Sequence, residues 1–455
     1  MRSVHPATGR LVQEYAGHSP ADAAACLDRA AAAQPAWAAL PFAARAAVLV
    51  RAAALLRERA PSLARLATIE MGKPIAQAEG EVEKCAWVCE WYAEHAERLL
   101  ADEAVATDAT RSGTCCEPLG VLLAIMPWNF PYWQVFRAAA PALMAGNVVA
   151  LKHSSNVPGV ALAIESLLRE AGAHEGVFVT LLVPASGAAA LIAHEAVAAV
   201  TLTGSEAAGR QVAATAGAAL KKVVLELGGS DPFVVLADAD VKEAAAVAVT
   251  ARVQNNGQSC IAAKRFVVEA LVAAEFTREF VERTRALVVG DPLDRATQVG
   301  PLARPEFVDD LDDQVRRSLA AGATLLVGGA RREGPGWFYR PTVLGNVSPG
   351  MAAFDEETFG PLAPITVARD AADAVRLANL TRFGLGASVW TRDAARGEAL
   401  AREIRAGAVF VNGMVKSDPR LPFGGIRCSG HGRELAGAGI REFVNLKTIW
   451  VRDGR

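Results

Sequence analysis

The first hundred residues follow a helical pattern of apolar and polar positions. Ser19 and Pro20 place a capping residue and then a proline at the first helical position, ahead of an alanine-rich run to about Trp37. A second run with helical periodicity covers 41–60, and a third covers 75–100. The pattern therefore predicts a mostly helical N-terminal region.

Beyond residue 119, short apolar runs alternate with amphipathic ones. The expected strands cover 120–126, 147–151, 176–180, 198–203 and 222–225, and the expected helices cover 131–144 and 157–171. Such alternation predicts a parallel sheet with helices on both faces. A nucleotide would bind at the carboxyl ends of its strands.

The second half of the chain repeats this alternation from residue 228. We expect a strand over 265–268, with helices over 240–254, 273–288 and 305–321. The last of these helices carries four aspartates between 309 and 313, followed by two arginines. That arrangement favours a solvated helix face over a metal site. Extended, β-prone stretches at 105–117 and 443–451 complete the pattern.

Length and composition exclude several classes of protein. At 455 residues the chain is too long for one core and suggests two or three domains. A content of 52% hydrophobic and 21% charged residues is typical of a globular chain rather than a disordered one. The net charge of −2 offers no footprint for nucleic acid. Charges, prolines or glycines interrupt every apolar run before it reaches membrane-spanning length, so we expect no membrane contact.

The cysteines indicate a reducing compartment. There are seven, an odd and thinly scattered set, and the N-terminus lacks an apolar signal stretch. We therefore expect free thiols and a cytoplasmic protein. Cys85 and Cys89 lie one helical turn apart, but no second pair of ligands accompanies them. Core packing is favoured there, and no metal site is expected.

One strand end and one loop could carry chemistry. Glu226 ends a β-branched run and is followed by two glycines, and Cys260 lies in a glycine-containing loop, Asn-Asn-Gly-Gln-Ser-Cys at 255–260. The thiolate would attack a substrate, and the carboxylate would move protons or activate water. A buried cysteine and a surface glutamate would give the same sequence pattern, so the pair alone does not decide the matter.

A possible phosphate site follows the strand expected at 198–203. No Gly-x-Gly-x-x-Gly is present, but Gly204 and Ser205 open a helix. Backbone N–H groups and a hydroxyl at a helix N-terminus suit a pyrophosphate. An ordinary capping turn would look the same.

A set of short motifs, taken together, is much more specific. They are Pro-Trp-Asn-Phe-Pro at 127–131, Ala-Gly-Asn at 145–147 with Lys152, Thr-Gly-Ser at 203–205, Leu-Glu-Leu-Gly-Gly at 225–229, Gly-Gln-Ser-Cys at 257–260, Glu-Glu-Thr-Phe-Gly-Pro at 356–361 and Pro-Phe-Gly-Gly at 422–425. In this order and along nearly the whole length, the sequence resembles the aldehyde dehydrogenase superfamily. Taken as a whole, the sequence is most similar to those of the shorter bacterial succinate-semialdehyde dehydrogenases.

The resemblance implies an α/β architecture, the aldehyde dehydrogenase fold, with three parts. Residues 1–104 and 119–227 would form a Rossmann-like dinucleotide-binding domain. Residues 228–430 would form an α/β catalytic domain. Residues 105–118 and 431–455 would form a small β oligomerisation arm, which implies a homodimer or homotetramer.

The resemblance also assigns the catalytic roles. Cys260 matches the nucleophile that attacks the aldehyde to give a thiohemiacetal. Asn129 matches the amide that, with the cysteine's own N–H, stabilises the oxyanion. Glu226 matches the general base that helps water to cleave the resulting thioester. Superfamily members that transfer the acyl group to coenzyme A typically lack this glutamate, so its presence implies a free acid as product.

Cofactor residues carry over in the same way. Lys152 resembles the lysine that binds the adenosine ribose, and Ser205 resembles the pyrophosphate ligand. Glu357 and Phe359 resemble the pair that holds the nicotinamide ribose and ring. The neighbouring positions expected in the cofactor site are Trp128, Gly204 and Leu227.

Ser155 bears on the choice between NAD and NADP. NAD-selective members often carry a glutamate three residues after the lysine, where it binds both ribose hydroxyls and repels a 2′-phosphate. Ser155 is small and neutral. We therefore expect NADP to be preferred, with NAD also accepted. The neighbouring His153 is expected to be solvated.

Helical spacing suggests the substrate. Trp133 and Arg137 follow Asn129 at intervals of four, on a face that lines the substrate tunnel in the family. A buried arginine needs an anion, and the carboxylate of succinate semialdehyde would fit, with a hydroxyl from Ser417. Alternatively, Arg137 pairs with an internal acid or lies outside the tunnel.

The expected function is therefore oxidation of a small aldehyde, best of all succinate semialdehyde, with NADP or NAD. Another short-chain aldehyde remains an alternative. So do a coenzyme-A-acylating dehydrogenase, which Glu226 disfavours, and a thiol hydrolase, which Lys152 and the 204–205 turn disfavour. A catalytically silent homologue would be expected to have lost Cys260 or its partners, and none is lost.

Overall fold

The computed structural model describes residues 1–454 and contains two large sheets. The first has the order β17-β9-β8-β5-β6-β7, and its strands are β5 (Val121–Met126), β6 (Val148–His153), β7 (Phe178–Thr180), β8 (Val197–Thr203), β9 (Lys222–Glu226) and β17 (Gly430–His431). All neighbours in it are parallel except β17, which pairs antiparallel with β9. The strand order reverses at β5, so this sheet has the doubly wound form expected from the sequence.

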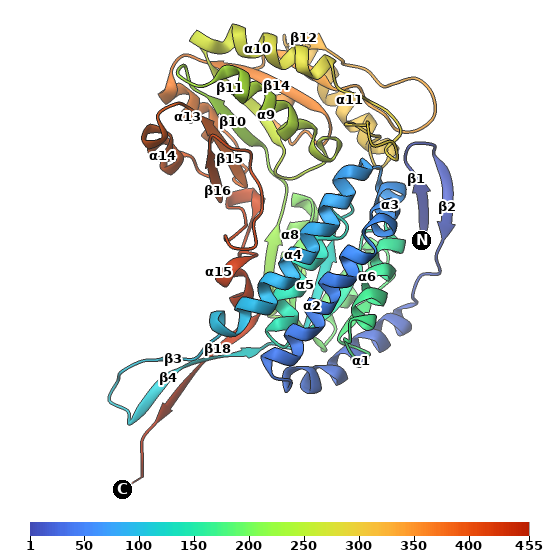
Figure 1. The fold of residues 1–455 in the computed structure, drawn as a ribbon, viewed down its shortest axis with the longest axis vertical. Helices are drawn as coiled ribbons and strands as arrows, with labels where there is room; N and C mark the ends of the chain where they lie inside the picture. Colours follow the sequence, from blue (N-terminus) through green and yellow to red (C-terminus); the bar gives the residue numbers. More distant parts are fainter. Residues whose placement is uncertain (455) are drawn as a thin grey trace.

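The second sheet lies between β9 and β17 in the sequence. Its order is β12-β13-β14-β11-β10-β15-β16, with β10 (Asp231–Val235), β11 (Ala263–Glu269), β12 (Thr324–Val327), β13 (Thr342–Gly345), β14 (Leu362–Ala368), β15 (Gly386–Trp390) and β16 (Ala408–Val411). Only the β12–β13 pair is antiparallel. Figure 1 shows this sheet with its helices as a separate lobe above the first.

A three-stranded arm projects from the body of the molecule (Figure 1). It consists of β3 (Glu103–Ala104), β4 (Arg111–Pro118) and β18 (Val444–Val451), and β18 pairs with β4 from Val444–Pro118 to Val451–Arg111. Residue 455, the last of the expected arm, lies outside the described residues. Leu446, Ile449 and Trp450 on β18 are exposed, although apolar strands of this kind are usually covered.

The N-terminal region is helical, as its pattern predicts. Its helices are α1 (Pro20–Ala38), α2 (Phe42–Glu58), α3 (Ala60–Met71) and α4 (Ile75–Leu99). The predicted cap of α1 is confirmed, because Ser19 Oγ accepts from the N–H of Asp22 and the Asp22 carboxylate accepts from the N–H of Ser19. A hairpin of β1 (Arg2–His5) and β2 (Arg10–Glu14) precedes them and was not expected. Every residue of β2 is exposed, so neither face of the strand needs apolar side chains. Its sequence therefore lacks the alternation by which a half-buried strand is predicted.

Of the remaining helices, those at 133–144, 158–170, 206–218, 241–253, 270–285 and 305–320 fall close to their predicted places, and the others were not expected. The remaining helices are α5 (Trp133–Met144), α6 (Pro158–Glu170), α7 (Ala188–Ala193), α8 (Glu206–Ala218), α9 (Val241–Val253), α10 (Ala270–Arg285), α11 (Pro305–Ala320), α12 (Ala352–Asp355), α13 (Ala371–Asn379), α14 (Ala394–Glu403) and α15 (Ala436–Arg441). On α11 the acidic residues form surface ion pairs, among them Asp313 with Arg316 and Arg317. The solvated face is therefore confirmed.

Two further expectations concern the core and the membrane. Cys85 and Cys89 are fully buried among apolar side chains of the first core, as predicted for packing residues. Among the described residues no single helix is long and apolar enough to cross a membrane, although α1 and α2, joined at a sharp bend, meet the criterion together.

Candidate active site

The loop that carries Cys260 has an unusual backbone. Asn255, Asn256 and Gly257 all have positive φ, at 53°, 59° and 77°. Asparagine and glycine adopt this left-handed conformation at the lowest cost, which explains the Asn-Asn-Gly run. At Gly257 a Cβ would also lie 2.4 Å from the backbone of Gly360. The sequence therefore fixes a tight turn just ahead of the cysteine.

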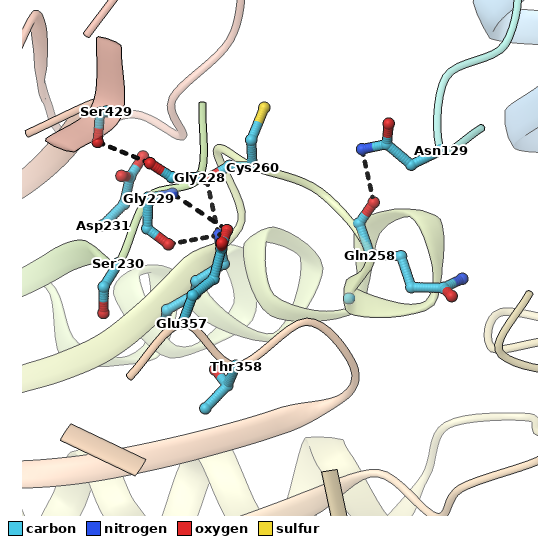
Figure 2. A network of polar contacts seen from close by, with 12 residues as sticks. Asn129, Gly228, Gly229, Ser230, Asp231, Gln258, Cys260, Glu357, Thr358 and Ser429 are labelled. Atoms are coloured by element: carbon cyan, nitrogen blue, oxygen red, sulfur yellow. Dashed lines mark hydrogen bonds and ion pairs between the residues drawn. The ribbon is translucent and has the colours of Figure 1, made fainter. Parts of the chain in front are cut away.

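Side-chain amides hold this loop against the Pro-Trp-Asn-Phe-Pro segment. Asn255 Nδ2 donates to the carbonyl of Asn129 at 2.6 Å, and Asn129 Nδ2 donates to the carbonyl of Gln258 at 3.0 Å. Figure 2 shows the Asn129 amide facing Gln258, with the Cys260 side chain pointing out of this network. Asn129 is thus fixed beside the cysteine loop, with its second amide hydrogen not used by this bond.

Cys260 opens into a cavity of about 560 Å³ at the junction of the two lobes. Its lining includes Trp133, Arg137 and Ser417, the three residues predicted to bind substrate, together with Lys84, Phe130 and Phe423. A volume of this size suits a small molecule. The predicted nucleophile and the predicted substrate residues are therefore brought together.

Burial and the nearby cations shift the pKa of the Cys260 thiol in opposite directions. Burial raises the pKa of its thiol to about 11, while the nearby cations Arg137 and Lys264 favour the thiolate. Lys264 Nζ donates to the Cys260 carbonyl at 2.8 Å. The resting side chain is therefore a thiol, and a base or a cofactor-induced change must help to ionise it.

Glu226, at the end of β9, is buried without a hydrogen-bond partner for either carboxylate oxygen among residues 1–454. Burial raises its pKa well above the ordinary value, and the neighbouring carboxylate of Glu434 adds to this. Its side chain lies against Gly424, where a Cβ would be 2.7 Å from Glu226 Oε1. Glycine at 424 thus makes room for the carboxylate, which does not line the cavity itself.

Arg137 is not the unpaired guanidinium that the sequence analysis expected. It lines the cavity but is 2% exposed and forms an ion pair with Glu434. It also donates to Thr203 Oγ1 at 3.3 Å and lies over the ring of Phe423. Burying an arginine is costly without an anion, and the protein supplies that anion internally. The internal acid that the alternative named is therefore present, while Arg137 also lines the cavity.

Lys84 is a cavity residue that the sequence analysis missed. It lies on α4, and its Nζ donates to Ser417 Oγ at 2.8 Å and sits 4.2 Å from the centre of the Trp133 ring. Burial and the charge of Arg137 lower its pKa to about 8. No motif marks it; only the position of Lys84 on the cavity-facing side of a long helix could have indicated it.

The predicted cofactor residues gather at one edge of the first sheet. Because β9, β8, β5 and β6 are parallel neighbours, their carboxyl ends meet there. The residues at or just beyond those ends are Trp128, Lys152, Ser155, Gly204, Ser205 and Leu227. This is the edge at which nucleotides bind in doubly wound sheets.

Lys152 and Arg304 make part of this edge cationic. Lys152 is 6% exposed and forms no ion pair or side-chain hydrogen bond within the described chain, and burial and the charge of Arg304 lower its pKa. Arg304 donates to Asn156 Oδ1 at 3.1 Å and to Ser154 Oγ at 3.5 Å, on either side of Ser155 in sequence, and its nearest carboxylate is 3.9 Å away. A buried cation without an acid partner, beside a second cation that has only a distant one, suits a phosphate-bearing ribose.

His153 differs from expectation. It is 3% exposed, and its ring nitrogens lie 3.1 Å from the Met126 carbonyl and 2.9 Å from the Pro131 carbonyl. Burial lowers its pKa to about 4, so the ring is neutral. The histidine ties β6 to the segment before α5 and is not solvated.

Ser205 and Glu357 are engaged within the protein. Ser205 caps α8, its Oγ accepting from the N–H of Ala208 at 3.3 Å. Glu357 Oε1 accepts from the N–H of Gly229 at 3.0 Å and from Lys264 Nζ at 2.8 Å, and Figure 2 shows it turned toward Gly229. Both capping and phosphate binding use the helix N-terminus, so the two readings of Ser205 are compatible.

An aromatic cluster joins the two lobes beside this edge. Trp128 stacks on Phe307 at 5.0 Å between ring centres and meets Phe359 edge-on at 5.8 Å. The cluster brings Phe359 of the second lobe to the cofactor edge of the first. No group of three or more acidic, histidine or cysteine side chains suited to a metal ion occurs in the part of the chain that the structure describes.

Comparisons with known proteins give one consistent family. The family model described as "Aldehyde dehydrogenase family" matches residues 1–449. A Synechocystis sp. protein named "probable succinate-semialdehyde dehydrogenase (NADP+)" is 53% identical over 449 residues, covering 99% of each chain. The Mycobacterium avium succinate-semialdehyde dehydrogenase (NADP+) is 50% identical over 453 residues, covering 99% of this chain and 96% of that protein.

Solved structures agree in fold. Succinic semialdehyde dehydrogenase from Streptococcus pyogenes, determined with NADP+, has a TM-score of 0.97 at 34% identity and covers 99% of this chain and 100% of that one. Lactaldehyde dehydrogenase from Escherichia coli has the same TM-score at 32% identity, covering 100% of this chain and 96% of that one, so the fold alone does not select a substrate. By its sequence, its fold and the arrangement of its site, this chain belongs to the aldehyde dehydrogenase family.

Proposed function

We propose that this protein oxidises succinate semialdehyde to succinate, with NADP preferred and NAD accepted. The observation that carries the proposal is the cavity, which joins the Cys260 thiol to the Lys84 ammonium, a cation with no carboxylate partner among residues 1–454. A short aldehyde with a carboxylate at its far end matches both groups. The relatives named as NADP-dependent succinate-semialdehyde dehydrogenases support the same substrate and cofactor.

In the proposed mechanism, Cys260 releases its proton to solvent and its thiolate attacks the aldehyde carbon. The oxyanion of the thiohemiacetal is stabilised by the Asn129 amide and by the backbone N–H of Cys260. Arg137 and Lys264 lower the cost of the negative charge that develops at this point. When bound, the oxidised nicotinamide supplies the acceptor for the hydride.

Loss of the hydride leaves an acyl thioester on Cys260, which water must cleave. Glu226 is the proposed base, because burial and the charge of Glu434 raise its pKa and so make its carboxylate a stronger proton acceptor. Its carboxylate must turn from Gly424 toward the cysteine, or act through an intervening water. Transfer to water gives succinate and the free thiol.

The cofactor would bind along the first sheet's edge. Lys152 would bind the adenosine ribose, and Ser155 and Arg304 would leave room and charge for a 2′-phosphate. Gly204 and Ser205 at the start of α8 would bind the pyrophosphate. The rest of the cofactor would be enclosed by Trp128, Leu227, Glu357 and Phe359. Glu357 would first have to give up its ion pair with Lys264.

Two broader properties belong to the proposal. The exposed apolar side chains of β18 support a homodimer or homotetramer in which the arm extends a partner's sheet. The seven cysteines are all unpaired, which supports a cytoplasmic location.

The test is a panel of succinate semialdehyde and butanal with each cofactor, with and without coenzyme A, followed by the absorbance of the reduced nicotinamide. We expect the highest kcat/KM for succinate semialdehyde with NADP and no stimulation by coenzyme A. A preference for butanal contradicts the substrate, and stimulation by coenzyme A contradicts the free acid. Absence of any absorbance change favours a thiol hydrolase or an inactive homologue.

A further inference from the structure

The segment that carries Asn129 has no regular secondary structure. It runs from the end of β5 at Met126 to the start of α5 at Trp133. Asn129 is the proposed oxyanion donor, and a donor of this kind acts only when it is held closely in place. Because no strand or helix ladder fixes the segment, side chains from other elements must hold its backbone.

His153 contacts both ends of this segment. It is the last residue of β6, and in the sheet it pairs with Met126 at the end of β5. Its Nδ1 is 3.1 Å from the Met126 carbonyl oxygen, and its Nε2 is 2.9 Å from the Pro131 carbonyl oxygen. One ring therefore contacts the backbone on either side of Asn129 in the sequence.

The surroundings of the ring indicate which nitrogen carries its hydrogen. His153 is 3% exposed and neutral, because burial lowers its pKa to about 4. The Ser154 N–H donates to Nδ1 at 2.9 Å and to the Met126 carbonyl at 2.9 Å. Among residues 1–454 no donor contacts Nε2. A hydrogen on Nε2 therefore satisfies both nitrogens, since Nδ1 then accepts from Ser154 and Nε2 donates to Pro131.

The Pro131 carbonyl depends on this bond. Pro131 is buried, and within the described chain its carbonyl accepts from no other donor. A buried carbonyl that loses its partner is costly, so the backbone would shift to find another one. Because Asn129 and Pro131 are separated by one residue, such a shift would also move the Asn129 amide.

The rest of the segment is held by other elements. Glu81 on α4 accepts the N–H groups of Tyr132 and Trp133, each at 2.9 Å, and Asn255 donates to the Asn129 carbonyl. His153 is the contact from β6, and it directly follows Lys152, the residue proposed to bind the adenosine ribose. Kinetics can therefore separate an effect of His153 on the reaction from an effect on cofactor binding.

We propose that His153 is a positioning residue, whose Nε2 hydrogen bond to the Pro131 carbonyl keeps the Asn129 amide where the oxyanion forms. The inference rests on the oxyanion role proposed above for Asn129. His153 does not line the cavity that Cys260 enters, so it acts through the backbone of the segment. This role replaces the solvated histidine that the sequence suggested.

The first test compares His153→Gln with His153→Asn. Both are neutral amides, but only the longer glutamine places an N–H near the position of Nε2. We expect the rate of the pre-steady-state burst of reduced cofactor to fall at least about tenfold in His153→Asn and less than about threefold in His153→Gln. The loss should be the same with succinate semialdehyde and with butanal, because both form the oxyanion.

Cofactor affinity is measured on the same variants. The Kd of NADP, followed by protein fluorescence, should change less than about threefold in both. A raised Kd at an unchanged burst rate would show that His153 serves the Lys152 end of β6 and would overturn the proposal. So would an equal loss of burst rate in His153→Gln and His153→Asn.

The second test is a double-mutant cycle with Asn129→Ala. If His153 acts through Asn129, adding His153→Asn to Asn129→Ala should change the burst rate less than about twofold. Multiplied losses would overturn the proposal. If Asn129→Ala alone keeps the wild-type burst rate, the oxyanion role of Asn129 is wrong. If Asn129→Ala loses the burst and His153→Asn keeps it, only the role of His153 is wrong.

The matched control for stability is Phe276→Leu, which trims a fully buried side chain of α10 in the other lobe. It should lower Tm and keep the burst rate. A similar fall in burst rate in this control would show that general destabilisation explains the loss and would overturn the proposal. Should His153→Asn fail to fold, His153→Phe keeps a ring, removes both nitrogens and must show the same tenfold loss.

Discussion

Lys84 Nζ donates a hydrogen bond to Ser417 Oγ over 2.8 Å, although 333 positions separate the two residues. The bond joins a helix of the cofactor lobe to the loop that leads back from the catalytic lobe, at the wall of the cavity that Cys260 enters. It places a positive charge and a hydroxyl together where an aldehyde acid would end. We therefore propose that substrate selection depends on the junction between the two lobes.

The pH dependence of substrate choice follows from Lys84. Its pKa is lowered to about 8, first by burial and then by Arg137 on α5, while Cys85 and Glu81 on α4 and Asp418 in the loop oppose this. Lys84 is charged below that pKa and neutral above it, whereas the substrate's carboxylate stays ionised.

The ratio of kcat/KM for succinate semialdehyde to that for butanal should therefore fall as pH rises through about 8. Ionisation of Cys260 affects both aldehydes and cancels in the ratio. In Lys84→Met the ratio should be flat with pH; a wild-type ratio that is equally flat excludes Lys84 as the titrating group.

Cys260→Ala should reduce dehydrogenase activity by at least about a thousandfold, because among residues 1–454 no other cysteine lines the cavity. Binding of NADP, followed by fluorescence of the protein, should persist. Cys428→Ala, which removes a half-buried cysteine far along the chain, serves as the control and should keep full activity. Steady turnover by Cys260→Ala would refute the assignment of the nucleophile.

Glu226→Gln should slow deacylation by about 10²- to 10⁴-fold while leaving a pre-steady-state burst of reduced cofactor. A protonated glutamate cannot accept a proton, and the pKa of Glu226 is raised by burial and by Glu434. Wild-type deacylation should therefore increase with pH through a pKa above the usual range of glutamate. Loss of the burst along with turnover would place Glu226 in the first half of the reaction instead.

Arg137→Ala should destabilise the protein rather than change its selectivity. Removing one member of a buried ion pair leaves Glu434 unpaired, which costs about 3–5 kcal/mol. We expect a lower Tm and similar losses with succinate semialdehyde and butanal. A loss confined to succinate semialdehyde, at unchanged Tm, would return the carboxylate to Arg137.

Cofactor choice can be reversed at two positions. Ser155→Glu should shift the ratio of kcat/KM for NADP to NAD toward NAD by at least about tenfold, because a carboxylate repels the 2′-phosphate. Arg304→Ala should raise KM for NADP more than KM for NAD, since it removes a cation beside Lys152. Wild-type selectivity for NAD of about tenfold or more would contradict the reading of Ser155.

Much of the fold could be predicted because its elements carry local signals. Ser19 and Pro20 mark the start of α1, and the β-branched run before Glu226 marks β9. The hairpin of β1 and β2 could not be predicted in this way, because β2 is exposed along its whole length and has no apolar face. Its pairing depends on contacts, not on sequence periodicity.

The site was predictable where motifs define it and not where tertiary contacts do. The Asn-Asn-Gly run before Cys260 has a local conformational reason. The partner of Arg137 does not, because Glu434 lies almost three hundred residues away in the sequence and meets it only in the folded chain. Lys84 was not predicted as a site residue for the same reason. A lysine on a helix is usually solvated, and only the folded structure shows that Lys84 lines the cavity.

The most direct test of the account is to trap its central intermediate. Glu226→Gln, mixed with succinate semialdehyde and NADP and then quenched in acid, can be digested and examined by mass spectrometry. We expect a succinyl thioester on the peptide that carries Cys260, formed only when NADP is present. An unmodified Cys260, or the adduct on another cysteine, would contradict it.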